Sequence, residues 1–192
     1  MILAYKEYTI EVTDDQAYKL HADDNSAFYS KIYDGTSAGG QNLHPTAQYG
    51  VRVYLGEREI ASVLICETGG YAGVQTHTCI IYEDTLLICC CDKVYALKLP
   101  DLTMYWIRKA DPATCFGIYA WEDDFVIHGE LRITRIDIHG NEKWSFGGRD
   151  IFVTPDGSSA FELRGDKIIL TDWGAYTYKL DSNGIVLNND QQ

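Results

Sequence analysis

The chain has 192 residues, of which 16 are basic and 28 acidic, giving a formal net charge of −12. Because no basic stripe runs along it, the charge pattern argues against binding to nucleic acid and against docking on an anionic membrane. The first residues lack the pattern of a secretory signal, and no apolar run reaches the roughly 20 residues of a membrane span, so we expect a cytoplasmic protein.

The composition favours strands over helices. Tyrosine is frequent, with 14 residues, whereas methionine occurs only twice. Long amphipathic stretches free of Gly, Pro and Asp are missing, as in all-β proteins. The length fits a single domain over residues 1–192, with a less regular part at 1–70 and a repetitive part at 71–192.

The N-terminal part predicts several strands. Residues 4–12 alternate between two faces and predict one strand, with further strands at 16–22 and 27–33. The Gly- and Ser-rich stretch 34–45 predicts a long loop. Residues 49–55 and 59–66 flank a short Gly-containing turn and predict a hairpin.

The remaining chain repeats itself three times. Each copy has a short apolar run, then an alternating strand, a turn and an exit residue; the runs are 85–88, 125–127 and 167–170, and the strands are 94–99, 133–138 and 176–180. The exit residues are Trp106, Trp144 and Val186. A spacing of roughly 40 residues is typical of propeller blades and other β-repeats, which bury their apolar faces by stacking.

Short acidic or Gly-containing links between the strands predict tight turns and a meander. Trp106 and Trp144 hold matching positions, and we expect them to pack between neighbouring sheets. The fold class is therefore all-β, an antiparallel meander of about three propeller-like repeats plus N-terminal strands. It forms either a small or open propeller-like array or a β-sandwich.

The segment Val94-Tyr-Ala-Leu-Lys-Leu-Pro-Asp-Leu-Thr-Met-Tyr-Trp106 resembles the blade motif of PQQ-like, quinoprotein-type β-propeller repeats. Residues 135–144 are similar and keep the turn glycine, and residues 178–184 keep the turn without the Trp. The resemblance covers about residues 75–187 and implies blade-type repeats. It does not extend to the quinone, since no residues here match its binding site, and no cofactor is expected.

The six cysteines, Cys66, Cys79, Cys89, Cys90, Cys91 and Cys115, are too sparse to indicate a disulfide framework in a chain of this size. We expect reduced thiols packed as small apolar residues.

Motifs for chemistry are weak. None of the five histidines lies in a metal-binding spacing, and no nucleophile elbow or phosphate-binding loop is present. If adjacent repeats stack, His77 could approach Cys115 or the pair His128 and Glu130, which defines one candidate binding cluster. These residue types would suit a metal or a thiol nucleophile.

A second candidate is the loop Gly147-Gly148-Arg149-Asp150. Loops on a rigid scaffold are the usual binding surface, and Arg149 and Asp150 place opposite charges on one. The alternative interpretation is a β-bulge with an internal ion pair.

These observations favour a non-enzymatic β-repeat module that binds another protein. An acidic protein is steered toward basic partners, so an inhibitor or immunity-type protein that covers a basic partner is one form of this hypothesis. The alternative is an enzyme or a small-ligand or metal-binding domain that uses the His/Cys/Glu cluster. A third possibility is a structural fragment that completes a larger propeller by self-association through its edge strands.

Overall fold

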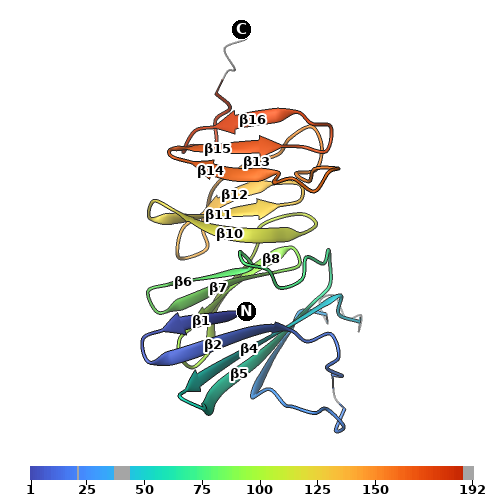
Figure 1. The fold of residues 1–192 in the computed structure, drawn as a ribbon, viewed down its shortest axis with the longest axis vertical. Helices are drawn as coiled ribbons and strands as arrows, with labels where there is room; N and C mark the ends of the chain where they lie inside the picture. Colours follow the sequence, from blue (N-terminus) through green and yellow to red (C-terminus); the bar gives the residue numbers. More distant parts are fainter. Residues whose placement is uncertain (21, 37–43, 188–192) are drawn as a thin grey trace.

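A computed structural model describes residues 1–20, 22–36 and 44–187. The strands form four β-sheets, mostly antiparallel, that are stacked in a column (Figure 1). The sheets follow one another in chain order, from the N-terminal sheet to the last repeat. No helix occurs in the described residues. Accordingly, the described part of the chain contains no helical segment that could cross a membrane.

The three repeats form three blade-like sheets. Blade 1 contains β6 (Cys79–Tyr82), β7 (Thr85–Cys90), β8 (Lys93–Lys98) and β9 (Thr103–Lys109). Blade 2 contains β10 (Cys115–Trp121), β11 (Asp124–Gly129), β12 (Ile133–Ile136) and β13 (Glu142–Phe146). Blade 3 contains β14 (Phe161–Arg164), β15 (Lys167–Thr171) and β16 (Thr177–Leu180). Consecutive strands pair antiparallel within each blade. The all-β meander predicted from the sequence is confirmed, and the stack of four sheets replaces the β-sandwich alternative.

The N-terminal sheet has the order β1-β2-β4-β5-β3, with β1 (Ile2–Tyr5), β2 (Tyr8–Asp14), β3 (Lys31–Asp34), β4 (Ala47–Leu55) and β5 (Arg58–Glu67). The predicted β4–β5 hairpin is confirmed. The single strand predicted at 4–12 is wrong, because a turn at Lys6, with φ of 51°, divides it into β1 and β2.

Two other predictions in this region are wrong. Residues 16–20 form turns and irregular structure, because the Gln48 side chain donates to the backbone carbonyls of Gln16 and Tyr18 and holds that segment across the sheet. The strand predicted at 27–33 begins only at Lys31, and it pairs parallel with β5. Most of the loop predicted at 34–45 lies outside the described residues.

Three separate apolar cores fill the spaces between the four sheets. The first joins the N-terminal sheet to blade 1, the second joins blade 1 to blade 2, and the third joins blade 2 to blade 3. A middle blade therefore buries both of its faces. In β7, Leu86 and Ile88 face the first core and Leu87 and Cys89 the second. This explains why the sequence shows continuous apolar runs rather than alternation.

The exit tryptophans connect each blade to the next. Trp106 donates its indole N–H to the carbonyl of Ile138 at 2.9 Å, and Trp144 donates to Ser182 at 3.0 Å. Each indole lies against the turn glycine of the following blade, Gly140 or Gly184, both with φ of 75°. The predicted packing of these side chains between sheets is confirmed, and it includes a specific hydrogen bond.

A tyrosine has the same role for blade 1. The Tyr33 hydroxyl, on β3, donates to the carbonyl of Leu102 at 2.8 Å and accepts from the amide of Met104 at 3.0 Å. The Lys31 ammonium donates to the Asp101 carbonyl at 2.8 Å in the same turn. The N-terminal sheet therefore docks on blade 1 as one blade docks on the next.

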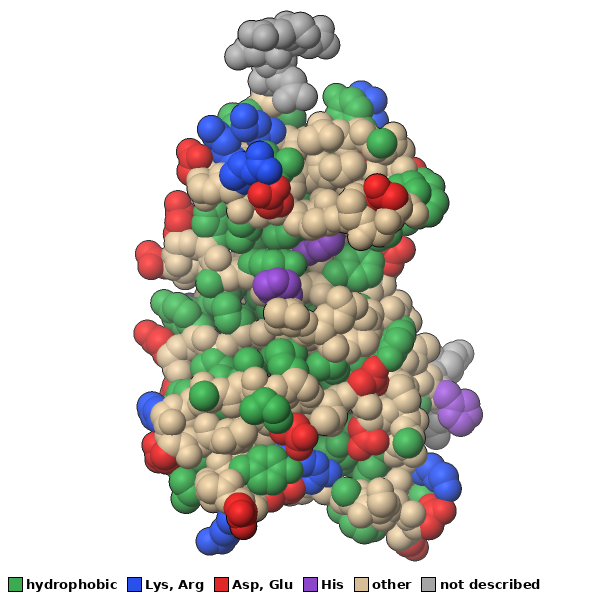
Figure 2. All heavy atoms as spheres, viewed as in Figure 1, with side chains coloured by type: hydrophobic (Ala, Val, Ile, Leu, Met, Phe, Trp, Pro, Cys, Tyr) green, Lys and Arg blue, Asp and Glu red, His purple; other side chains and the backbone are tan. Residues whose placement is uncertain are grey.

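The two ends of the stack are closed differently. Residues 22–30 lie against the outer face of the N-terminal sheet, where Ser30 bonds to Ser62 and Tyr29 lies over Gly50. At the other end the outer face of blade 3 is polar, with Arg164, Lys167 and Lys179 beside Asp166 around Ile169 (Figure 2). Terminal repeats with a polar outer face are a requirement of soluble repeat proteins.

Candidate functional site

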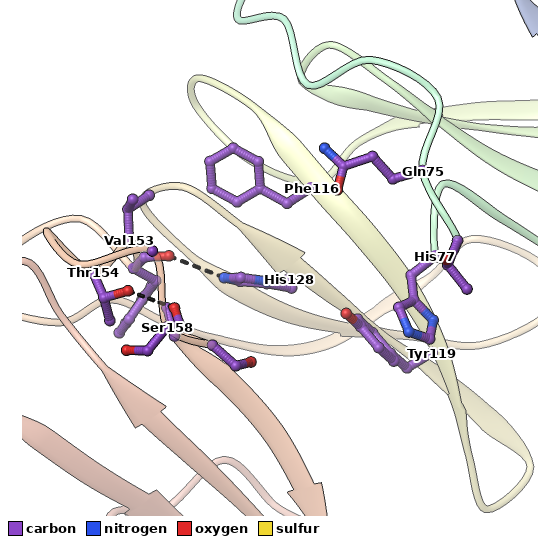
Figure 3. A pocket seen from close by; sticks show the side chains of 13 residues that line it. Gln75, His77, Phe116, Tyr119, His128, Val153, Thr154 and Ser158 are labelled. Atoms are coloured by element: carbon purple, nitrogen blue, oxygen red, sulfur yellow. Dashed lines mark hydrogen bonds between the residues drawn. The ribbon is translucent and has the colours of Figure 1, made fainter.

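A cavity of about 610 Å³ opens between blades 2 and 3, beside the loop that precedes blade 1 (Figure 3). Strand β10 contributes Phe116 and Tyr119, and the end of β11 contributes His128. The remaining walls are residues 75–77 and the segment 152–160, which leads into β14. Pockets that bind small molecules span roughly 300 to 1,000 Å³, so this cavity has the size of such a site.

A continuous series of ring contacts forms the floor of this inter-blade cavity. The His77 ring lies 4.4 Å from Tyr119, and Tyr119 lies 4.6 Å from Phe161. The Phe161 ring stacks on the His128 ring with 5.1 Å between their centres. The series ends at Phe116, whose ring centre lies 5.3 Å from that of His128. Such packing restricts the rings, so the cavity is preformed.

Among the described residues, the lining includes no Asp, Glu, Lys or Arg. Burial lowers the pKa of His128 to about 4, although the hydrogen bond between Nε2 and the Phe152 carbonyl, at 3.0 Å, opposes that shift. At neutral pH the imidazole is therefore uncharged and Nε2–H donates to the carbonyl. The cavity is a neutral environment in an acidic protein.

The pKa of His128 predicts a loss of stability in acid. The unfolded chain takes up this proton near pH 6.5 and the folded chain only near pH 4, so stability is complete above about pH 6.5 and falls between these values. We expect the contribution to be about 2 kcal/mol, since water at the cavity mouth screens part of the effect. Urea denaturation gives the free energy of unfolding of wild type and His128→Gln at pH 7 and pH 4.5. The contribution of His128 is the extra stability that wild type loses between these pH values. His139→Gln is the control for replacing an exposed imidazole; an equal pH dependence in wild type and His128→Gln contradicts the prediction.

The structure brings together only part of the predicted His/Cys/Glu cluster. His77 and His128 line the same cavity, but Cys115 is buried in the core between blades 1 and 2. A hydrogen bond with Cys89, together with burial, raises the pKa of the Cys115 thiol well above its usual range, so it is no thiolate nucleophile. Glu130 connects loops through its backbone, bonding to Thr114 and Phe152.

No cluster of three or more His, Cys, Asp or Glu side chains suited to a metal ion occurs in residues 1–20, 22–36 and 44–187. All six cysteines are buried free thiols. Neighbouring thiols in one strand belong to different cores, since Cys89 faces blade 2 and Cys90 faces the N-terminal sheet.

The other predicted site, Arg149 and Asp150, lies on a rim loop at one edge of blade 3. The Arg149 guanidinium stacks 4.0 Å from the centre of the Tyr176 ring, while Asp150 accepts from the amide of Ile151. The exposed side chains Trp173 (48%) and Tyr176 (44%) come from the neighbouring β15–β16 turn. We call Arg149, Asp150, Trp173 and Tyr176 the rim patch.

Hydrogen bonds beneath the rim patch fix its two loops. The Tyr178 hydroxyl donates to the buried Asp172 carboxylate at 2.7 Å and accepts from the Arg149 amide at 2.8 Å. The Trp173 amide donates to the Ile151 carbonyl at 2.9 Å. The sequence indicated Arg149 and Asp150 through the adjacent glycines, but it gave no signal that Trp173 and Tyr176 lie beside them.

The fold and these sites define a class, a β-repeat protein with propeller-type blades. No protein-family model and no curated protein matches the sequence. Among solved structures, BamB from Moraxella catarrhalis is similar with a TM-score of 0.51 and 15% identity, over 76% of this chain and 46% of BamB. The computationally designed protein Ika8 is similar with a TM-score of 0.52 and 10% identity, over 97% of this chain and 59% of Ika8. The WD40 domain of Neurospora crassa Pan2 has a TM-score of 0.46 and 13% identity, over 62% of this chain and 37% of that chain.

The chain therefore spans about half the length of BamB. At these identities the similarity shows the fold, a set of propeller-type repeats, and nothing about activity.

Proposed function

We propose that this chain is a non-enzymatic, cytoplasmic module that binds another protein through the rim patch. The observation that carries the proposal is the Arg149–Tyr176 stack beside the exposed Trp173. Trp, Tyr and Arg are the residues that dominate binding energy in protein interfaces. A patch whose loops are already fixed loses little conformational entropy on binding, which favours affinity.

The partner that suits this surface is a basic protein. Asp150 is exposed at the patch and offers a carboxylate, and the exposed Trp173 ring offers a face for a Lys or Arg side chain. The net charge of −12 would speed association with a cationic partner at low salt. The blades are proposed to be of the PQQ-like kind without a quinone, on the resemblance of residues 94–106.

The test compares tagged wild-type protein, Trp173→Ala and Arg149→Ala as baits in cell extract, with quantitative mass spectrometry of what each retains. We expect one basic protein to bind wild type and to bind each variant roughly 30-fold more weakly, the effect of losing about 2 kcal/mol at a hot spot. Ile60→Ala, which alters an exposed apolar side chain in the N-terminal sheet, is the control. A partner retained equally by all four baits, or no partner in wild type, contradicts the proposal.

A further inference from the structure

We propose that the inter-blade cavity is a binding site for an uncharged sugar. This site is separate from the rim patch, and the inference does not depend on the protein-binding function. Three properties of the cavity together select this chemical class: its charge, its unpaired hydroxyl groups and its aromatic walls.

The first property is that every described residue of the lining has an uncharged side chain at neutral pH. A phosphate, a carboxylate or an ammonium group that enters the cavity would lose its hydration without gaining a counter-charge, which is costly. Nucleotides and amino acids are thereby disfavoured.

The second property is a set of hydroxyl groups without a protein partner. Within the described part of the chain, the hydroxyls of Thr76 and Tyr119 make no hydrogen bond to protein atoms, and Figure 3 shows the Tyr119 hydroxyl directed into the cavity. The Ser158 hydroxyl is bonded to the Asp156 carboxylate. Burial raises the pKa of Tyr119, so its phenol stays protonated and can donate. By contrast, Thr154 and Ser159 are occupied with the carbonyls of Ser158 and Phe161. A purely apolar ligand would remove water from the unpaired hydroxyls without forming a hydrogen bond to them, which is unfavourable.

The third property is the apolar surface beside these hydroxyls, formed by Phe116, Val153 and Ala160. A sugar ring combines apolar C–H groups with a rim of hydroxyls that donate and accept, which matches apolar walls beside unpaired hydroxyls. The cavity needs no rearrangement to receive it, because the stacked rings beneath are already packed.

The test is saturation-transfer NMR on the purified chain with a panel of glucose, galactose, mannose, N-acetylglucosamine, maltose and cellobiose. Glucose 6-phosphate and adenosine serve as charged and aromatic comparators. We expect transfer to at least one uncharged sugar, with no transfer to glucose 6-phosphate. Calorimetry then gives the affinity, and Tyr119→Phe should weaken it roughly tenfold, because the variant loses one hydrogen bond and retains every ring contact.

Tyr105→Phe is the matched control, because Tyr105 is exposed on β9 and remote from the lining. Three outcomes overturn the inference: no sugar in the panel binds, glucose 6-phosphate or adenosine binds more tightly than every sugar, or Tyr119→Phe binds as wild type does. Since the rim variants Trp173→Ala and Arg149→Ala leave the cavity unchanged, sugar binding and partner binding can fail independently.

Discussion

Replacing Trp144 with alanine should lower the free energy of unfolding by about 3 kcal/mol and release blade 3 before the rest of the stack. The side chain packs in the core between blades 2 and 3, and it holds the turn of blade 3 through its bond to Ser182. In a stacked repeat protein each sheet is stabilised mainly by its neighbours, so loss of one docking contact weakens the terminal sheet most.

Urea denaturation followed by circular dichroism measures the change, and hydrogen exchange locates it. We expect the amides of β15, such as Ile168 and Leu170, to exchange faster while those of β7 remain protected. Trp144→Phe separates the hydrogen bond, worth about 1 kcal/mol, from the packing. Trp173→Ala is the control, since that ring is 48% exposed and should change stability by no more than about 0.5 kcal/mol.

Gly184→Ala tests the same contact from the opposite side. A Cβ there would lie 2.6 Å from the Trp144 indole, and the backbone φ of 75° disfavours an L side chain as well. If Trp144→Ala proves as stable as Trp173→Ala, the tryptophan does not hold the blades together.

The repeats were predictable because their turns are encoded locally. Glu83, Glu122 and Gly165 lie at equivalent turns between the first and second strands of the three blades, and all three have positive φ. Short acidic and glycine-containing links between apolar runs indicate such turns, whatever the tertiary contacts. The packing of Trp106 and Trp144 between sheets was predictable for the same reason, because each follows the turn of its own blade at a similar spacing.

The N-terminal sheet was less predictable for two physical reasons. The β1–β2 turn occupies only Lys6 and Glu7 and contains no Gly, Asp or Asn, and Tyr5 pairs with Tyr8 across it. Alternation therefore continues almost unbroken, and one strand cannot be told from two. Strand β3 is fixed by parallel pairing with β5, about 30 residues away, which no local pattern encodes.

The cavity depended on information that a single sequence lacks. His77 and His128 were brought together as predicted by stacking, but the register of the strands decides which side chains face inward. Cys115 falls in the core while Tyr119, four residues later, lines the cavity. On a regular strand the two side chains would share a face, but a β-bulge between Cys115 and Gly117 reverses the alternation. A shift of one residue along a strand moves a side chain from the core face to the cavity face, or the reverse.

Replacing Asp111 with alanine should cost about 4 kcal/mol or more, which places it among the most destabilising single changes in the chain. The side chain is only 2% exposed, and its two oxygens accept four backbone N–H groups. Oδ1 accepts from Ala113 at 2.7 Å and Thr114 at 2.9 Å, and Oδ2 accepts from Leu131 at 2.9 Å and Arg132 at 2.7 Å.

The size of the effect follows from the four backbone amides that lose their acceptor when the Asp111 carboxylate is removed. Hydrogen bonds to a charged group contribute roughly 1.5–3 kcal/mol each, and a buried amide left without an acceptor costs about 1–3 kcal/mol. Water that enters the space left by the side chain offsets part of this sum. Asp111→Asn should have a smaller effect, because its remaining oxygen still serves one pair of amides.

Asp156→Ala is the matched control, because Asp156 is exposed and accepts from the backbone amide of one neighbouring residue, Ser158, at 3.0 Å, besides hydroxyl groups of its own loop. We expect a loss of no more than about 1 kcal/mol there. Chemical denaturation of the three variants at pH 7 gives the ranking Asp111→Ala, Asp111→Asn, Asp156→Ala in order of decreasing damage. Equal losses in Asp111→Ala and Asp156→Ala would mean that the four amides find other acceptors. The junction of the loop before β10 with the β11–β12 turn would then depend on packing rather than on this carboxylate.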